Sequence, residues 1–251
     1  MELSAVIITQ DEEAHIVRCI TSLAGAVDEV IIVDSGSSDH TVELARAHGA
    51  SVTHRPWTNY SDQKNFANGL ARGGFILSVD ADEALSPQLR DSILQARKQG
   101  LSGAYSLSRM TNYCGSWIRH GGWYPDTKIR IFPKDKARWE GAFVHETLEL
   151  GPGVSVTPLR GDLLHYSYGS ISDHIRQVDL FTTIGAQGLF GRGKRAGFTK
   201  LFLSPAAKFI GDYLLRGGFR DGWYGFVIAR ISAHATFLKY AKLRQLWREQ
   251  A

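Results

Sequence analysis

The sequence predicts an α/β protein with a parallel sheet in its first part and a helical region at its end. Short apolar runs alternate with helix-spaced segments over residues 1–100, a pattern typical of parallel strands joined by helices. Residues 101–170 change to strands with aromatic and glycine-rich turns, and residues 171–251 have mainly helical spacing. We therefore expect one domain over residues 1–170, divided near residue 100, followed by a helical region over residues 171–251.

The elements expected in the first hundred residues follow one another without a long linker. The strands are apolar runs, and the helices have apolar residues three or four positions apart. In chain order we expect strand 3–8, helix 12–23, strand 29–34, helix 41–48, strand 51–54, helix 61–71, strand 75–79 and helix 87–99. Further strands are expected at 104–109, 128–132 and 143–150. Because alternating strands and helices build open parallel sheets, ligands are expected at the carboxyl ends of the first strands.

Length and composition are those of a globular protein. A chain of 251 residues with 43% hydrophobic and 22% charged residues buries a sizeable core, which excludes a disordered class. The two cysteines, Cys19 and Cys114, match neither a zinc pattern nor a disulfide framework, and they fit a reducing compartment. No secretory signal is visible before the first strand. We expect a cytoplasmic protein.

The net charge of +4 is unevenly distributed along the chain. Residues 192–251 contain 12 Lys and Arg against 3 acids, a net charge of +9, which leaves −5 for the remainder. Apolar and aromatic residues are interleaved with these bases, and no window reaches the roughly 18 apolar residues of a membrane span. The pattern predicts either a basic amphipathic region at an anionic membrane surface or ordinary helices with solvated basic faces. No nucleic-acid recognition module is present, so nucleic acid is not an expected partner.

Two carboxylates at the end of strand 75–79 are the clearest chemical signal. Asp80 and Asp82 stand at positions i and i+2, where a strand's pleat aims both side chains the same way. Carboxylate oxygens suit Mg²⁺ or Mn²⁺, ions that usually keep positions open for a substrate's phosphates. An acidic turn at the end of a strand would give the same residues. Thr9 and Asp34 occupy the ends of two other expected strands.

Three ordered motifs resemble those of family 2 glycosyltransferases: Ala5–Ile16, Val33–Thr41 and Ser78–Glu83. The downstream motifs Trp123–Phe132, Gly141–Glu146 and Leu164–Tyr166 resemble the branch of lipopolysaccharide core β-1,4-glucosyltransferases. One departure is Asp11, where the first motif more often has Asn. The resemblance implies a GT-A fold, a UDP-sugar donor, a divalent metal and an inverting transfer of a hexose, glucose in that branch, to a glycolipid such as the lipopolysaccharide inner core.

The resemblance also implies roles for residues of the nucleotide-sugar half, residues 1–100. Asp34 would accept the N3–H of uracil, or else only form the turn that follows its strand. Thr9 and Glu12 would face the base and ribose, although Glu12 could equally complement the dipole of the following helix. Lys64 would contact the diphosphate, or else be a solvated surface lysine.

The metal site has three predicted ligands. The resemblance assigns Asp80 to the ribose and metal environment and Asp82 to direct coordination of Mg²⁺ or Mn²⁺. His165 follows an apolar run and could supply a third, nitrogen ligand, as a late histidine does in some GT-A enzymes. A core histidine with a satisfied hydrogen bond is the alternative reading.

The catalytic base is expected in the acceptor half, residues 101–170. An inverting transfer needs a base on the side of the sugar opposite the leaving UDP. Glu146, beside His145, and Asp126 are the two candidates, and Glu146 is preferred. Arg109 and Arg130 add cations to this half, either for a phosphorylated acceptor or as solvated strand residues.

Two other classes compete with a glycosyltransferase. A nucleotidyltransferase would share the half-sheet and the metal site, but it usually has a glycine-rich loop after the first strand, where this chain has Thr9–Glu13. A non-catalytic sugar- or lipid-binding module needs no metal motif. The sequence favours a metal-dependent transferase that acts at the inner face of the cytoplasmic membrane.

Overall fold

The computed structural model describes residues 1–141 and 146–250. The chain forms two compact units, the first made of Met1–Arg109 with Asp126–Tyr166 and the second of Met110–Pro125 with Ser167–Ala251. The second unit thus includes the end of strand β6 (Ala104–Tyr113) and the loop that follows it, together with the C-terminal helices. The expected domain boundary at residue 170 stays a prediction.

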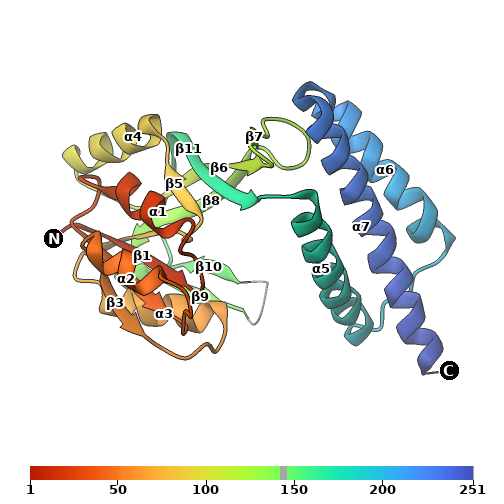
Figure 1. Cartoon of the computed structure of the whole chain (residues 1–251), viewed down its shortest axis with the longest axis horizontal. Helices are drawn as coiled ribbons and strands as arrows, with labels where there is room; N and C mark the ends of the chain where they lie inside the picture. Colours follow the sequence, from red (N-terminus) through yellow and green to blue (C-terminus); the bar gives the residue numbers. More distant parts are fainter. Residues whose placement is uncertain (142–145, 251) are drawn as a thin grey trace. The chain divides into compact units, whose positions relative to one another are not determined.

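The first unit begins with four parallel strands joined by helices (Figure 1). The strands lie in the order β3-β2-β1-β4, and β1 is paired in parallel with both β2 and β4. Their bounds are β1 Leu3–Thr9, β2 Glu29–Asp34, β3 Ser51–His54 and β4 Phe75–Ser78. The helices are α1 Ile16–Leu23, α2 Thr41–Ala47 and α3 Tyr60–Leu70. This half-sheet was expected from the alternating apolar pattern.

Antiparallel strands extend the sheet beyond β4. β8 (Asp126–Pro133) pairs antiparallel with β4, and β6 (Ala104–Tyr113) pairs antiparallel with β8. β11 (Val156–Tyr168) and β5 (Glu83–Leu85) complete the order, and α4 (Pro87–Lys98) follows β5. The remaining strands are β7 Ser116–Trp117, paired with β6, and the hairpin β9 Ala137–Glu140 with β10 Thr147–Leu150. The prediction of a mixed α/β fold is confirmed.

Several of these strands were not predicted. β5 has three residues, too few for an alternating pattern, and β11 contains Pro158 and Gly161, residue types depleted in strands. The strand expected at 143–150 is described only as Thr147–Leu150, because residues 142–145 lie outside the described residues.

Apolar side chains from both faces of the sheet form its core. Leu3, Ile7 and Ile32 are fully buried on one face and pack with residues of α1 and α4. Val6, Val33 and other apolar residues on the opposite face pack with α3 and β9. Strands covered on both faces read as nearly continuous apolar runs, which is why β1 and β2 are recognisable in the sequence.

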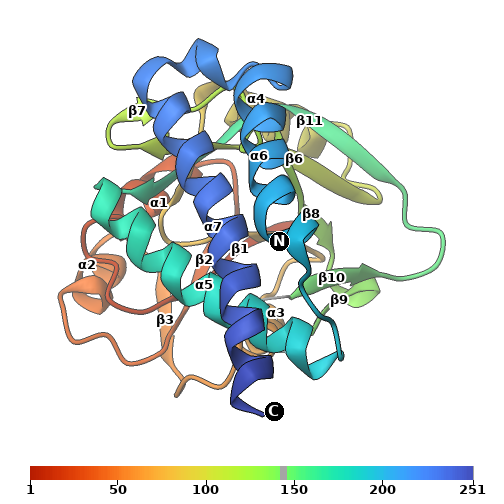
Figure 2. The ribbon, with the colours of Figure 1, turned by 90° about the vertical axis from the view of Figure 1, so that its right-hand side faces the viewer.

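The second unit is mainly helical, as predicted for the end of the chain. α5 (Ile171–Gly191) and α6 (Ser204–Ile210) both pack along α7 (Gly222–Glu249), as Figure 2 shows. Short π-helical segments at Thr199–Leu203 and Gly211–Leu215 extend α6 at both ends. Tyr113 is fully buried in this unit among aromatic rings. Among the described residues, no helix is both long enough and apolar enough to span a bilayer.

Gly161 provides a stability test of the contact between β11 and α4. Its φ is +94°, and a Cβ built there would lie 2.3 Å from the backbone nitrogen of Leu89. Gly161→Ala should lower the free energy of unfolding by about 3 kcal/mol or more, because it combines backbone strain with a clash against main-chain atoms. Urea titration followed by circular dichroism measures this.

Gly153→Ala is the matched control. Gly153 also has a positive φ, +75°, but no heavy atom of the described chain lies within 4 Å of its built Cβ. Its substitution should cost only about 1 kcal/mol from backbone strain. Equal losses in the two variants would show that the close approach to α4 contributes nothing to stability.

Candidate active site

The site is built at the carboxyl ends of β1, β2 and β4. The parallel register places Thr9 beside Asp34 and Asp34 beside His54, so the strand ends lie along one edge. Thr9 is buried, and its Oγ1 has no hydrogen-bond partner among the described residues. A buried hydroxyl without a partner is costly, which makes Thr9 a candidate for contact with a ligand.

Asp34 forms the turn that follows β2. Its Oδ2 accepts hydrogen bonds from the backbone N–H of Gly36 at 2.9 Å and of Ser37 at 3.1 Å, and its Oδ1 accepts one from the Ser37 hydroxyl. Asp34 therefore forms the turn after β2, which is one of the two roles predicted for it. A carboxylate has about four acceptor positions, so these bonds leave room for one more donor. The uracil contact stays a prediction.

The two aspartates of the acidic motif lie in a turn between β4 and β5. β4 ends at Ser78, and the N–H of Glu83 bonds to the carbonyl of Asp80 at 3.0 Å. The expectation that a strand pleat aims both carboxylates the same way is therefore wrong. The two side chains have different partners because a turn, not a strand, sets their directions.

Asp80 is held by a buried arginine. Arg130 Nη2 lies 2.8 Å from Asp80 Oδ2 and 2.8 Å from Oε1 of the fully buried Glu83. Burial alone would raise the pKa of Asp80, but Arg130 and Lys64 hold it well below its usual range. Burial and the Asp80 charge raise the pKa of Glu83, against the opposing effect of Arg130. Arg130 is thus a structural ion-pair partner, and the reading of a solvated strand cation is wrong for it.

Lys64 connects Asp80 to Glu146. Its Nζ lies 3.5 Å from Asp80 Oδ1, 3.4 Å from Glu146 Oε1 and 4.5 Å from the centre of the Trp139 ring. The residue is buried, so the reading of a solvated surface lysine is wrong. A buried cation between two carboxylates is placed to neutralise charge at this edge of the sheet.

Asp82 has a different partner, His165. Oδ2 of Asp82 lies 3.0 Å from Nε2 of His165, and β11 brings His165 opposite Glu83 in register with β5. His165 Nδ1 is buried without a hydrogen-bond partner among the described residues, which does not fit the reading of a satisfied core histidine. Strand pairing thus joins two predicted ligands that are far apart in sequence.

The described residues offer few side-chain ligands for a divalent metal. Within residues 1–141 and 146–250, no group of three or more His, Cys, Asp or Glu side chains is arranged to hold an ion. Asp82 and His165 nevertheless place one oxygen and one nitrogen side by side. Mg²⁺ is commonly bound by one or two carboxylates together with substrate phosphates and water, so the Asp82 carboxylate fits such an ion, and His165 would add a less common nitrogen ligand. Asp80 as a ligand stays a prediction, because Arg130 and Lys64 contact its carboxylate.

Glu12 lies near several acids of the site. Burial, followed by the charges of Asp82, Asp39 and Asp80, raises its pKa to about 7. Its backbone N–H donates to the Thr41 hydroxyl at 2.7 Å. Since α1 begins only at Ile16, Glu12 precedes the helix and is not part of its first turn. Its predicted contact with the nucleotide stays a prediction.

The two candidate bases have different surroundings. Asp126 lies 2.7 Å from Arg109 Nη2 and 3.1 Å from Lys128 Nζ. Burial would raise the pKa of Asp126, but these cations keep it below its usual value. Glu146 has one cationic contact, Lys64, and a partly exposed side chain. His145, predicted beside it, lies outside the described residues.

Sequence reasoning missed the contacts that hold this site together, although Arg130 and Glu83 were both named. Glu83 and Arg130 form its central ion pair, and Asn65 bonds both backbone groups of Trp139, at 2.8 and 3.0 Å. A partial signal was available for Arg130, which stands alone between Ile129 and Ile131 in a strand. No pattern in the sequence indicates that Asn65 pairs with Trp139.

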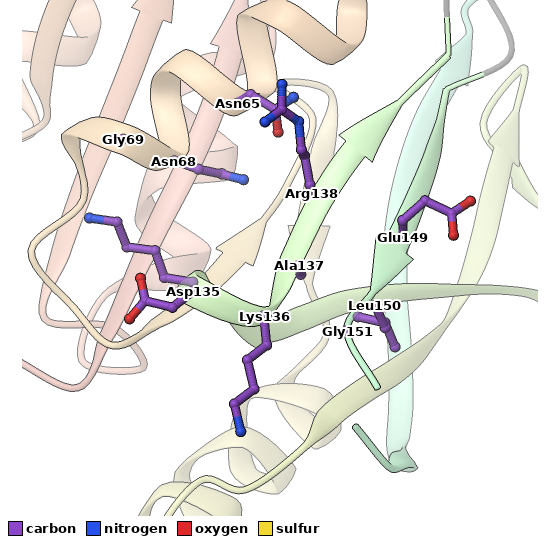
Figure 3. Close-up of a pocket in the computed structure, with 11 residues that line it drawn as sticks. Asn65, Asn68, Gly69, Asp135, Lys136, Ala137, Arg138, Glu149, Leu150 and Gly151 are labelled. Atoms are coloured by element: carbon purple, nitrogen blue, oxygen red, sulfur yellow. The ribbon is translucent and has the colours of Figure 1, made fainter. Parts of the chain in front are cut away.

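A separate cavity of about 600 Å³ lies beside α3 (Figure 3). Its lining comes from the far end of α3, from the turn after β8, and from β9 and β10. None of the predicted site residues is among those that line it. It is therefore distinct from the acidic edge described above.

The fold and the site define an α/β protein with an acidic ligand site at the carboxyl edge of a parallel half-sheet. Residues 4–147 match the family described as "Glycosyl transferase family 2". The chain is 33% identical to an uncharacterized glycosyltransferase of Rickettsia typhi, with 98% of this chain and 87% of the relative covered. It is also 31% identical to the lipopolysaccharide core biosynthesis glycosyltransferase LpsC of Rhizobium meliloti, with 98% and 93% covered. The chain belongs to glycosyltransferase family 2.

A solved structure is also similar over part of the chain. Glucosyl-3-phosphoglycerate synthase from Mycobacterium tuberculosis, in complex with Mn²⁺, UDP and phosphoglyceric acid, is 20% identical with a TM-score of 0.40. The likeness covers 53% of this chain and 56% of that chain.

The raised pKa of Glu12 predicts a pH-dependent stability. Between the unfolded value near 4.5 and the folded value of about 7, the folded state binds more protons, so stability falls as pH rises through this window. Glu12→Gln should remove that slope and raise the free energy of unfolding at pH 8 by about 1 to 2 kcal/mol, after allowance for solvent screening. Urea titrations in EDTA from pH 4 to pH 8, a range that brackets this window, measure the slope.

Glu13→Gln is the control for this test, because Glu13 is exposed and adjacent in sequence. It should leave the slope unchanged. A wild-type slope in Glu12→Gln would contradict the assignment of the titrating group.

Proposed function

We propose that this protein is an inverting glycosyltransferase that moves a hexose, glucose in the first instance, from a UDP-sugar to a cell-envelope glycolipid. The observation that carries the proposal is the gathering of Lys64, Asp80, Asp82, Glu146 and His165 at one edge of a family 2 fold. Two aspartates, a histidine, a buried cation and a glutamate as the base at one edge suit a reaction that releases a diphosphate and takes a proton. The lipopolysaccharide inner core is the proposed acceptor, supported by the similarity to LpsC.

The donor's nucleoside would lie against the ends of β1 and β2. Thr9 supplies a hydroxyl without a partner in the described chain, and Asp34 has room for one further donor. Glu12, whose pKa is about 7, would accept a hydrogen bond from the ribose when it is ionised. These residues would orient the nucleotide, and Lys64 would contact its diphosphate.

Asp82 and His165 would hold Mg²⁺ or Mn²⁺, with Asp80 contributing to its surroundings. The ion, when bound, supplies positive charge that stabilises the leaving diphosphate. Arg130 keeps the Asp80 carboxylate in place and ionised, so the turn presents a fixed negative charge. His165 Nε2 lies 3.0 Å from Asp82 Oδ2, a separation at which both atoms could coordinate one ion.

Glu146 is the proposed base. It would take the proton of the acceptor hydroxyl as the new bond to the sugar's C1 forms. Asp126 is the weaker candidate, since Arg109 and Lys128 both neutralise it and lower its pKa. A carboxylate that two cations stabilise in its ionised form is a poorer proton acceptor.

The acidic motif gives the first test. UDP release from a panel of UDP-sugars with Mg²⁺ or Mn²⁺, with and without lipopolysaccharide acceptors, measures turnover. Asp82→Asn should reduce metal-dependent turnover by about a hundredfold or more, because a ligand carboxylate is lost without change of shape. Asp91→Asn, at an exposed position of α4, is the control and should retain full activity. Normal turnover by Asp82→Asn would exclude the proposed metal role.

The choice of base gives the second test. Glu146→Gln should lower kcat by about 10² to 10⁴ while the affinity for UDP changes little, because a base acts in the transition state. Asp126→Asn should have a smaller effect on kcat. Steady-state kinetics and UDP titration calorimetry separate the two parameters. The reverse order of the two kcat losses would assign the base to Asp126.

A further inference from the structure

Large apolar side chains are exposed along residues 198–226 of the second unit. Six of them, with exposed fractions between 51% and 82%, are Phe198, Phe202, Leu203, Leu215, Phe219 and Trp223. They flank α6: Phe198, Phe202 and Leu203 precede it, Leu215 follows it, and Phe219 and Trp223 lie just before and at the start of α7. Soluble surfaces rarely expose so many large apolar groups within so short a segment, so a partner is expected to cover them.

The charged side chains exposed along residues 192–226 are positive. Residues 192–226 contain seven Lys and Arg and two acids, Asp212 and Asp221. Both acids are turned inward: Asp212 is 3% exposed and pairs with Lys208 and Arg216, and Asp221 binds His120 Nδ1 at 2.7 Å. The exposed apolar side chains of this segment therefore have cations around them, and neither acid of the segment is exposed beside them.

A groove between α6 and α7 continues the apolar surface. Its volume is about 500 Å³, and Leu201, Pro205, Phe209 and Phe237 line it. Arg230 and His234 are the polar residues of its lining. The groove is mainly apolar with a cation beside it, a composition that suits a hydrocarbon chain next to an anionic group.

α5 provides an internal comparison in the same unit. Its Leu180 is 56% exposed, similar to the six residues above. The neighbouring Asp179, however, has a side chain that is 73% exposed, and Asp173 on the same helix is also partly exposed. These exposed carboxylates pair with Lys242 and Arg176 and so offset these cations at the surface of α5, which distinguishes this helix from residues 198–226.

We propose that residues 198–226, here termed the lipid face, dock on a bilayer surface rich in anionic lipid. Phe, Leu and Trp side chains would enter the interface while the exposed Lys200 and Arg220 meet the headgroups. A second copy of this chain is a poorer occupant, because a twofold interface would bring the same cations face to face. The inference rests on the proposed function only in that a glycolipid acceptor would reside in such a bilayer.

Vesicle binding of the full chain tests the lipid face. Co-sedimentation is measured with vesicles of phosphatidylcholine plus phosphatidylglycerol and with vesicles of phosphatidylcholine alone. The wild type should bind the anionic vesicles more tightly, and added salt should weaken this binding. The double variant Leu215→Glu with Trp223→Glu should bind about tenfold or more weakly, since it removes two inserted groups and adds two like charges.

Two further variants separate charge, insertion and general damage. Lys200→Glu should weaken binding to anionic vesicles about tenfold, because it reverses one charge at the interface. Leu180→Glu on α5 is the matched control, equal in chemistry and similar in exposure, and should bind like the wild type. Circular dichroism verifies that each variant is folded.

The contradicting results are specific. Equal binding by the wild type and the double variant would overturn the proposal, as would an equal loss in Leu180→Glu. A self-association that the double variant abolishes in sedimentation velocity, with vesicle binding unchanged, would assign the face to a second copy instead.

UDP release tests the proposed function independently of vesicle binding. UDP release without lipid should be the same in the double variant and the wild type, since none of its substitutions lies in the catalytic unit. Vesicle binding with no UDP release from any donor would refute the proposed function and leave the lipid face standing. UDP release without preferential binding to anionic vesicles would refute the lipid face alone.

Discussion

The site depends on one buried guanidinium. Arg130 reaches from β8 to the turn between β4 and β5 and binds the carboxylates of Asp80 and Glu83, both at 2.8 Å. Removing one partner of such a buried group typically costs about 3 to 5 kcal/mol, because it leaves an uncompensated charge. The shape of the turn, and with it the position of Asp82, therefore depends on an interaction that lies behind the reacting groups.

A second set of contacts joins the two parts of the proposed reaction. Asn65 acts toward Trp139 as a neighbouring strand would, since its side chain accepts from the backbone N–H and donates to the carbonyl. This bond fixes β9 against α3, and Lys64, one residue earlier, contacts both the Trp139 ring and Glu146. The cation proposed for the donor and the base proposed for the acceptor are thus held by one small network.

The second unit separates its charges by burial. Asp212 and Asp221 are used internally, to pair with nearby cations and to hold the loop at Arg119 and His120 against the start of α7. Burial also lowers the pKa of His174 to about 4, so this residue adds no positive charge to the interior at neutral pH. Along residues 198–226 the surface is therefore apolar and cationic, which is the property that the membrane proposal uses.

The sequence by itself determined the parallel half-sheet, the C-terminal helices and the family, because these depend on local periodicity and on short motifs at strand ends. It also singled out Asp80, Asp82 and Lys64 as candidates. Tertiary structure alone decided their contacts: the pairing of β11 with β5 brings His165 to Asp82, and β8 supplies Arg130 to Asp80. Such contacts join residues that no local pattern relates, since strand pairing and burial are set by the whole sheet.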